Sequence, residues 1–317
     1  MWLAHKLIQG VAQLTSHNKL PILIYHQVLE QPDPFRTCTP TVAEFRQQME
    51  IVGRYFKPLS IEEALALLRK NKLPANSICV SFDDGYLNNL TLAAPILKEL
   101  AIPATVYVSS AFTGGENMWN DKIIDFLFDQ EVVQYDFSVI DAGIHTIISN
   151  KQRNQLTLTI LEQLKYLPYK QRLEVVDNIL ECHHYKLGAA KMMNSQQLKK
   201  LKQYDITVAA HTHDHPIMAV LPIEEQQQQL ITNIEHLKQW GVADEPLGFA
   251  YPNGKMNQDY SQQTVELVKK LDFSHAVTTH HGVCTPSSDF FQLPRIGGWE
   301  KRPVRFHLRL LLDMIRG

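Results

Sequence analysis

The 317-residue chain has little net charge, few cysteines and no long apolar run. Its formal charge of −2 gives no basic field that would attract nucleic acid, so we expect no nucleic-acid partner. The four cysteines include no CxxC spacing, which argues against a cysteine-rich zinc site and against a disulfide framework. No stretch reaches the roughly 18 uncharged apolar residues of a membrane-spanning helix. We therefore expect no membrane span.

The two ends of the chain bear on its location. Residues 1–19 lack the basic head, the continuous apolar segment and the small-residue cleavage site of a secretory signal, so a cytoplasmic location is the default expectation. Residues 304–315 have the pattern of an amphipathic helix that carries Arg305 and Arg309. Peripheral contact with an anionic membrane is one use of such a helix, and packing against the body or a partner is the commoner one.

What the chain does have is a series of short apolar runs separated by helical patterns. Most of the runs are apolar on both faces, which favours buried parallel strands. They lie at 22–26, 78–82, 104–108, 206–211, 248–251, 275–279 and 293–296. Strands that alternate with helices predict a parallel α/β sheet, either a closed barrel or an open doubly wound sheet. A mainly helical segment at about 118–204 breaks the rhythm, and we interpret it as an insertion in a single domain spanning 1–317.

The first group of candidate site residues follows the run at 78–82. Asp83 and Asp84 are adjacent carboxylates that would repel each other unless a cation or hydrogen-bond donors held them. In parallel α/β folds, ligands bind at this carboxyl end of the strands. Gly85 would allow a sharp turn there. An ordinary Asp-Asp-Gly surface turn explains the same residues about as well.

The second group is His-Thr-His-Asp-His-Pro, which follows the run at 206–211. His211 and His215 are four residues apart, and Pro216 favours a tight loop over a helix. Two neutral imidazoles and one carboxylate form a common ligand set for Zn²⁺ and related metals, with positions left open for water and substrate. The alternative is a solvated His-rich loop. His213 has no assigned role.

The third group is Phe-Ala-Tyr-Pro-Asn-Gly at 249–254. Such a turn, which here runs from Tyr251 through Asn253, can present a backbone N–H group to a developing oxyanion. Taken alone the signal is weak, because Pro-Asn-Gly is common turn chemistry.

Together the three groups resemble the motifs of the polysaccharide deacetylases, the NodB-homology family also called carbohydrate esterase family 4. SFDDG at 81–85 resembles the first motif, HTHDH at 211–215 the second and FAYPNG the third, in the family's order. Residues 24–28 (IYHQV) are similar to the branch whose members begin with a Tyr-His-x-Val strand. The resemblance covers about 20–115 and 195–300, and it implies a distorted (β/α) barrel of about seven parallel strands with a helical insertion.

The resemblance also implies roles for individual residues. Asp84, His211 and His215 would bind one divalent metal ion, with Zn²⁺ as the first expectation and Co²⁺, Ni²⁺, Mn²⁺ or Fe²⁺ as alternatives. Asp83 would be the general base, and the Asn253 N–H would stabilise the oxyanion. The implied activity is hydrolysis of N-acetyl groups on an amino-sugar glycan, with release of acetate. The substrate would be an N-acetylated sugar, an oligosaccharide or a lipid-linked glycan precursor.

Two departures from the family pattern leave roles open. The third motif usually has an Arg where this chain has Ala250, so the base lacks its usual partner; Arg295 is the candidate replacement, and a surface arginine is an equal alternative. The usual late Leu-x-His acid motif is not evident either. In the Tyr-His-x-Val branch the acid histidine looks to come from the first strand, which makes His26 the general-acid candidate, with His280 and His281 as rivals.

Other functional classes remain open on sequence alone. One is an amidase for a small non-sugar amide or ureide, and another is a non-catalytic glycan-binding protein. The intact set of Asp83, Asp84, His211 and His215 argues against the non-catalytic alternative. Four aromatic residues could stack on sugar rings at the mouth of the site, although each is more often part of a core: Tyr25, Tyr86, Trp119 and Trp299.

Overall fold

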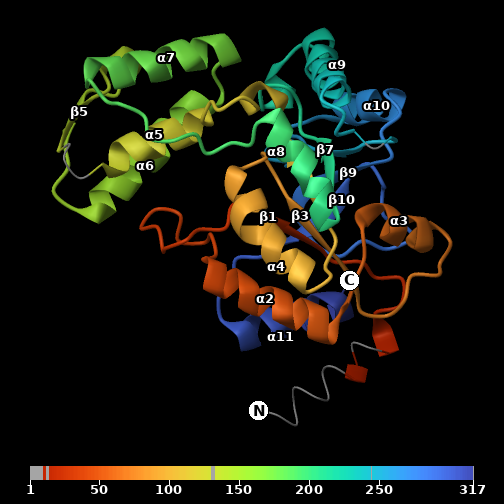
Figure 1. Ribbon diagram of the computed structural model, residues 1–317. Coiled ribbons are helices and arrows are strands. Elements are labelled where there is room, and N and C mark those ends of the chain that lie inside the picture. The colour runs from red at the N-terminus through yellow and green to blue at the C-terminus, as the bar shows by residue number, and fades with distance from the viewer. Residues whose placement is uncertain (1–9, 12–13, 130–132, 244, 317) are drawn as a thin grey trace. The chain divides into compact units, whose positions relative to one another are not determined.

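The computed structural model describes residues 10–11, 14–129, 133–243 and 245–316 (Figure 1). Expectations for residues 1–9 therefore lie outside the described residues. The chain divides into two compact units. One unit holds the segments up to Thr113 and from Met193 onward, and the other comprises Gly114–Met192. The expectation of one domain with an insertion at 118–204 stays a prediction.

The first unit is built on a closed barrel. Among the described residues, seven parallel strands follow one another around it in the order β1-β10-β9-β8-β7-β4-β3, and pairing of β1 with β3 closes the ring. The strands are β1 (Ile22–Tyr25), β3 (Ser77–Phe82), β4 (Ala104–Val108), β7 (Ile206–Ala210), β8 (Gly248–Ala250), β9 (His275–His281) and β10 (Leu293–Gly297). The predicted barrel and its seven strand positions are confirmed. A two-residue strand, β2 (Lys57–Pro58), pairs with β3 outside the ring.

The inward and outward faces of the strands explain why most of the runs are apolar on both faces. Side chains alternate between the two faces of a strand. Inward residues such as Ile22, Cys79 and Leu293 share a hydrophobic cluster with residues of the helix α3 (Ile61–Arg69). Outward residues such as Val80 and Ile296 belong to a larger cluster with the surrounding helices. With both faces covered, a strand needs apolar residues at every position.

Helices surround the barrel on its outer side, as Figure 1 shows for α2 (Val42–Tyr55) and α4 (Ala94–Glu99) beside β1 and β3. Polar residues cap their starts: Thr41 forms a capping box with Glu44 at the start of α2, and the Ser60 side chain caps α3. The remaining helices of this unit are α4 (Ala94–Glu99), α8 (Ser195–Lys200), α9 (Ile223–Gln239), α10 (Gln262–Lys270) and α11 (Pro303–Arg316). A five-residue π-helical segment, Asn89–Ala93, precedes α4.

The second unit has its own hydrophobic core, formed by helices, as predicted for most of this segment, and by a small hairpin. Phe126, Tyr135 and Ile160 are fully buried in it. Its elements are α5 (Trp119–Phe128), β5 (Gln134–Asp136), β6 (Ile144–Thr146), α6 (Asn150–Lys165) and α7 (Tyr169–Cys182). β5 and β6 pair antiparallel.

No helix within the described ranges is long and apolar enough to cross a lipid bilayer. The expected amphipathic helix at the C-terminal end is present as α11, which buries Phe306, Leu310 and Met314 against the barrel unit. Its apolar stripe is thus used for packing, which was the commoner of the two uses considered.

Candidate active site at the carboxyl end of the barrel

The turn after β3 presents two buried carboxylates at the barrel mouth. The Asp83 backbone N–H donates to the Tyr25 carbonyl oxygen at 2.9 Å, which ties the strand end to β1. Asp84 has φ +75° and Gly85 has φ +92°, so the chain turns through left-handed backbone. Asp83 and Asp84 are 2% and 4% exposed. Buried acids of this kind require a counter-charge, so they are not an ordinary surface turn.

The His-rich loop after β7 is held from two neighbouring elements. The Asn233 side chain of α9 accepts from the His211 N–H at 3.2 Å and donates to the Val108 carbonyl oxygen at 3.0 Å. The Ser109 hydroxyl donates to the His211 carbonyl oxygen at 2.8 Å. Thr212 and His215 lie at φ +65° and +53°. The tight loop that Pro216 predicted is therefore present, and its backbone is held in place by polar side chains.

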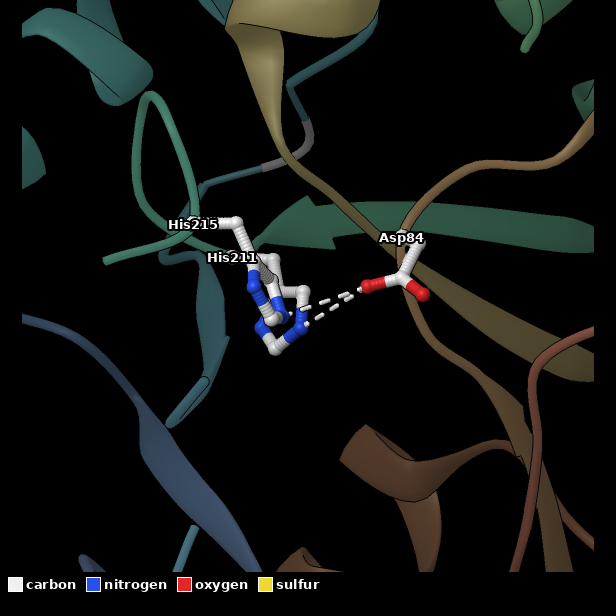
Figure 2. Close-up of side chains that lie close together, drawn as sticks. All are labelled: Asp84, His211 and His215. Carbon is white, nitrogen blue, oxygen red and sulfur yellow. Dashed lines mark ion pairs between the residues drawn. The ribbon is translucent and has the colours of Figure 1, made fainter. Parts of the chain in front are cut away.

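Asp84, His211 and His215 converge on one point, as Figure 2 shows. The Nε2 atoms of both histidines lie 3.4 Å from the same oxygen, Asp84 Oδ1. One ligand atom from each of the three residues can be chosen so that all lie within 4.8 Å of one another. These are the three residues proposed as metal ligands from the sequence.

The donor set fits a divalent cation on its own chemistry. His211 Nδ1 lies 2.7 Å from the Ala250 carbonyl oxygen, so Nδ1 carries a proton and a neutral imidazole has its lone pair on Nε2. That lone pair then faces Asp84 Oδ1, a buried oxygen with no hydrogen-bond partner in the structure. Two lone pairs 3.4 Å apart repel unless a proton or cation lies between them. Ligand separations near ~3.4 Å also follow from tetrahedral bonds of about 2.0–2.1 Å.

Asp83 forms a buried ion pair with Arg295 of β10. The guanidinium donates to both carboxylate oxygens, at 2.8 and 2.7 Å, and Arg295 is 1% exposed. It donates further to the Thr278 carbonyl oxygen at 2.8 Å and to the Ser81 hydroxyl at 3.2 Å. Of the two interpretations of Arg295, the structure therefore excludes the surface arginine and places it beside Asp83.

Charges at the mouth shift the pKa values of the site residues. Burial acts to raise the pKa of Asp83, but the Arg295 guanidinium outweighs it and holds that pKa below its usual range. The pKa of Asp84 is also lowered: burial opposes this, and the neighbouring His211 and His215 overcome it. Burial lowers the pKa of His211, yet the two carboxylates outweigh that effect and raise it. The site is thus electrostatically arranged to keep both carboxylates ionised.

The lowered pKa of Asp83 predicts acid sensitivity of the metal-free protein. A group whose pKa is depressed on folding adds stability above its unfolded pKa, and the stability is lost as pH falls through the folded value. Because the ordinary Asp pKa is 3.8, the free energy of unfolding should begin to fall below about pH 5. Urea unfolding in EDTA from pH 6 to pH 3 measures this. Asp83→Asn should have a shallower dependence over that range, and an identical slope in both proteins would contradict the assignment.

The Pro-Asn-Gly turn places the Asn253 backbone, but not the Tyr251 side chain, at the mouth. Asn253 has φ +58°, and no described residue accepts a hydrogen bond from its N–H. Gly254 is required next, since a methyl group there would lie 2.7 Å from the Thr279 nitrogen. Tyr251 is fully buried, with its hydroxyl donating to the Phe291 carbonyl oxygen at 3.0 Å. Its ring therefore belongs to the outer core.

His26 follows the last residue of β1 and is exposed at the mouth. Its charge acts on both Asp83 and Asp84, contributing to their lowered pKa values, so it lies near both carboxylates. Of the two rival histidines, His281 lies elsewhere, with its Nε2 3.3 Å from Asp313 of α11. His280 is exposed near the end of β9.

Several residues that position the site were not singled out from the sequence. Asn233 and Gln229 are on α9. The Gln229 amide donates to the Asp214 carboxylate at 3.0 Å and accepts from the Asp214 N–H at 3.0 Å, bracing the His-rich loop. Ser81 supports Arg295. The sequence signal that could have identified these residues is periodicity. It places a polar residue at an inward or core-facing position, and a buried polar group there needs a hydrogen-bond partner.

Comparison with known families agrees with this geometry. A model of the family described as polysaccharide deacetylase matches residues 70–275, which is more than half of the chain. The chain belongs to the polysaccharide deacetylase family. The match includes the Asp83-Asp84 turn, the His-rich loop and the Pro-Asn-Gly turn, whereas His26 and Arg295 lie outside the matched range.

Polysaccharide deacetylases are also found among the similar individual proteins. The chain is 22% identical over 279 residues to the poly-β-1,6-N-acetyl-D-glucosamine N-deacetylase of Staphylococcus epidermidis, covering 88% of this chain and 74% of that protein. The solved structure of the Streptococcus pyogenes deacetylase PplD in complex with acetate has a TM-score of 0.61 at 20% identity, covering 93% of this chain and 98% of that one. The structure of IcaB from Ammonifex degensii has a TM-score of 0.60 at 19% identity, with coverages of 94% and 97%. At this identity the solved structures establish a shared fold.

Proposed function

We propose that this member of the polysaccharide deacetylase family is a metal-dependent hydrolase that removes N-acetyl groups from an amino-sugar glycan. The observation that carries the proposal is the pair of features at one mouth: the Asp84, His211 and His215 cluster, and the buried Asp83–Arg295 ion pair. The first suits a cation, and the second keeps an ionised carboxylate ready to accept a proton.

In this proposal Asp84, His211 and His215 hold one divalent ion, for which Zn²⁺ is the first choice and Co²⁺, Ni²⁺, Mn²⁺ or Fe²⁺ are alternatives. When bound, such an ion acts as a Lewis acid toward the acetyl carbonyl and lowers the pKa of a water molecule. The Ala250 carbonyl oxygen supports this use of His211, since it holds the Nδ1 proton and leaves Nε2 free for the ion.

The remaining steps belong to side chains and backbone of this chain. Asp83 accepts a proton from water as the water oxygen adds to the acetyl carbon. Arg295 fixes the orientation of the Asp83 carboxylate through its two hydrogen bonds. The Asn253 N–H donates to the carbonyl oxygen as negative charge develops there. His26 donates a proton to the nitrogen as the C–N bond breaks, and acetate and a free amine leave.

The substrate class is inferred from family membership and from the name of the staphylococcal relative. We propose a polymer, oligosaccharide or lipid-linked glycan that contains N-acetylated amino sugars. The test is acetate release by metal-reconstituted protein from N-acetylglucosamine oligomers, compared with small non-sugar amides. Acetate from the oligomers and none from the amides supports the proposal. Activity confined to the small amides, or bound metal without any acetate release, rejects it.

Replacing either proposed histidine ligand should remove the metal. We expect His211→Ala and His215→Ala each to weaken Zn²⁺ affinity by more than about 100-fold, because changes to residues that merely support a ligand already cost 10–100-fold. Metal content after dialysis, together with zinc titration against a competing chelator, measures this.

His213 provides a matched control in the same loop. Its Nδ1 lies 2.9 Å from the Ser110 hydroxyl, and its ring packs beside His236 at 5.2 Å, so it is engaged with other partners. His213→Ala should keep stoichiometric metal. Equal loss of metal in all three variants would show that the loop, rather than the two ligands, is responsible.

A further inference from the structure

Among the described residues, Trp299 is an aromatic side chain that is exposed at the mouth. Tyr25 and Tyr86 are 1% and 2% exposed, so they are core residues rather than surface platforms. Trp299, which follows the carboxyl end of β10, is 52% exposed. Large aromatic side chains normally bury most of their area, and one held at the mouth of a polar site is suited to ligand contact.

The strand pattern places the Trp299 ring on the inner side of the barrel wall. Arg295 points inward to Asp83, and Ile296 belongs to the outer core, so the next inward position on β10 is Gly297. A methyl group on Gly297 would lie 2.6–2.8 Å from three atoms of the Trp299 indole. The ring therefore covers the inward face of Gly297, which is the next inward position after Arg295 toward the carboxyl end of β10. Only glycine at this position leaves room for the ring.

The strand order sets which groups Trp299 adjoins. β1 lies between β10 and β3, with Ile24 paired to Gly297 on one side and to Ser81 on the other. His26 follows β1, and Asp83 follows β3. The order of these residues around the rim of the barrel is therefore Trp299, then His26, then Asp83. A substrate held with its leaving nitrogen toward His26 would extend past it onto the indole.

The segment that carries Trp299 is fixed to the barrel. The Gln48 side chain of α2 donates to the Gly298 and Glu300 carbonyl oxygens, at 2.9 and 3.0 Å. The Gly298 N–H donates to the Ile24 carbonyl oxygen at 3.2 Å. A side chain held in place in this way loses little conformational entropy when a ligand binds.

The charges that flank Trp299 are matched locally. Glu300 pairs with Arg302 at 2.9 Å, and Lys301 lies 3.3 Å from Glu44. Lys301 and Arg302 therefore each have an acidic partner, and Arg305 also acts on Glu300. The surface next to the indole therefore suits an uncharged group better than a phosphate or a uronic acid.

We propose that Trp299 is a sugar-binding platform that stacks on the apolar face of an uncharged pyranose adjoining the residue that is deacetylated. This inference rests on the proposed function and narrows it: the preferred substrate has at least two sugar rings. Trp299 is then a specificity-determining residue, which adds affinity for longer chains and takes no part in bond breaking.

The test compares N-acetylglucosamine oligomers of one to five rings. We expect Trp299→Ala to lower kcat/KM about tenfold on oligomers, chiefly through KM, while leaving the monomer unchanged. Trp299→Phe, which keeps a ring, should lose less. Gly297→Ala should reproduce the loss with Trp299 still present, because the added methyl displaces the indole. Val304→Ala, which trims another exposed apolar side chain, serves as the control and should behave as wild type.

Binding gives a second measurement that does not depend on turnover. Isothermal titration of the N-acetylglucosamine pentamer into metal-free protein should show about tenfold weaker binding for Trp299→Ala. If no glycan is deacetylated but this difference in binding is seen, the proposed function fails and the platform stands. Wild-type kinetics and binding in Trp299→Ala would overturn the platform. An equal loss on monomer and oligomers would overturn it as well, since that indicates a structural role.

Discussion

Asp83→Asn is expected to lower kcat by ~10²–10⁴-fold on any N-acetylated glycan that the wild-type protein deacetylates. The amide has nearly the shape of the carboxylate but cannot accept the proton of the attacking water. Metal content should be unchanged, because Asp83 is paired with Arg295 and the proposed ligands are Asp84, His211 and His215. Acetate release and metal analysis on the same preparation separate loss of a base from loss of the ion.

Asp205 offers a control of the same chemical type. It forms an exposed ion pair with Lys98 at 2.7 Å, far along the chain from the proposed base. Asp205→Asn should retain wild-type turnover. Wild-type turnover in Asp83→Asn would remove the base from the mechanism, and loss of metal in that variant would move Asp83 into the ligand set.

The second large effect concerns Arg295 and should appear first as a loss of stability. Arg295→Met removes one partner of a buried ion pair and leaves the Asp83 carboxylate without its counter-charge. Breaking such a pair costs about 3–5 kcal/mol of unfolding free energy. The pKa of Asp83 should rise, because burial then acts without the opposing guanidinium. The acidic limb of the kcat/KM profile should therefore move to higher pH.

A double variant distinguishes the charge from the packing. In Asp83→Asn/Arg295→Met no unpaired carboxylate remains, so the variant should be more stable than Arg295→Met alone. Urea unfolding of the wild type, the two single variants and the double variant completes the cycle. Additive losses would mean that the two side chains do not interact energetically, which would contradict the ion pair as the basis of base orientation.

The barrel could be predicted from the sequence because its strands are covered on both sides. Most residues of runs such as 104–108 are apolar, whichever face they lie on, and each run is followed by a turn with polar or glycine residues. The same pattern fits an open sheet, however, and only the pairing of β1 with β3 distinguishes the two. That pairing is a long-range contact without a local signal, and the barrel followed from the family resemblance instead.

The site was predictable where side-chain direction follows from strand alternation. Arg295 could be placed near Asp83 because both lie at carboxyl ends of strands that the barrel brings together. Alternation also explains the location of Tyr251: Ala250 points into the barrel, so the next side chain points outward into the helical layer. The same rule applied to β10 would have singled out Gly297. The contacts of Asn233 and Gln229 could not be anticipated, since helix orientation over the barrel depends on packing between distant segments.

The backbone at the mouth has a consequence for how this protein can change. Four residues at the mouth adopt left-handed conformations without being glycine: Asp84, Thr212, His215 and Asn253. Each such residue costs roughly 1–2 kcal/mol, and more for the β-branched threonine. A substitution selected only for higher thermal stability would tend to return these residues to ordinary backbone conformations. The imidazoles or the carboxylate would then no longer point toward the metal site. Stabilising substitutions should therefore be placed in the outer helical layer, and the strained backbone at the mouth should be left unchanged.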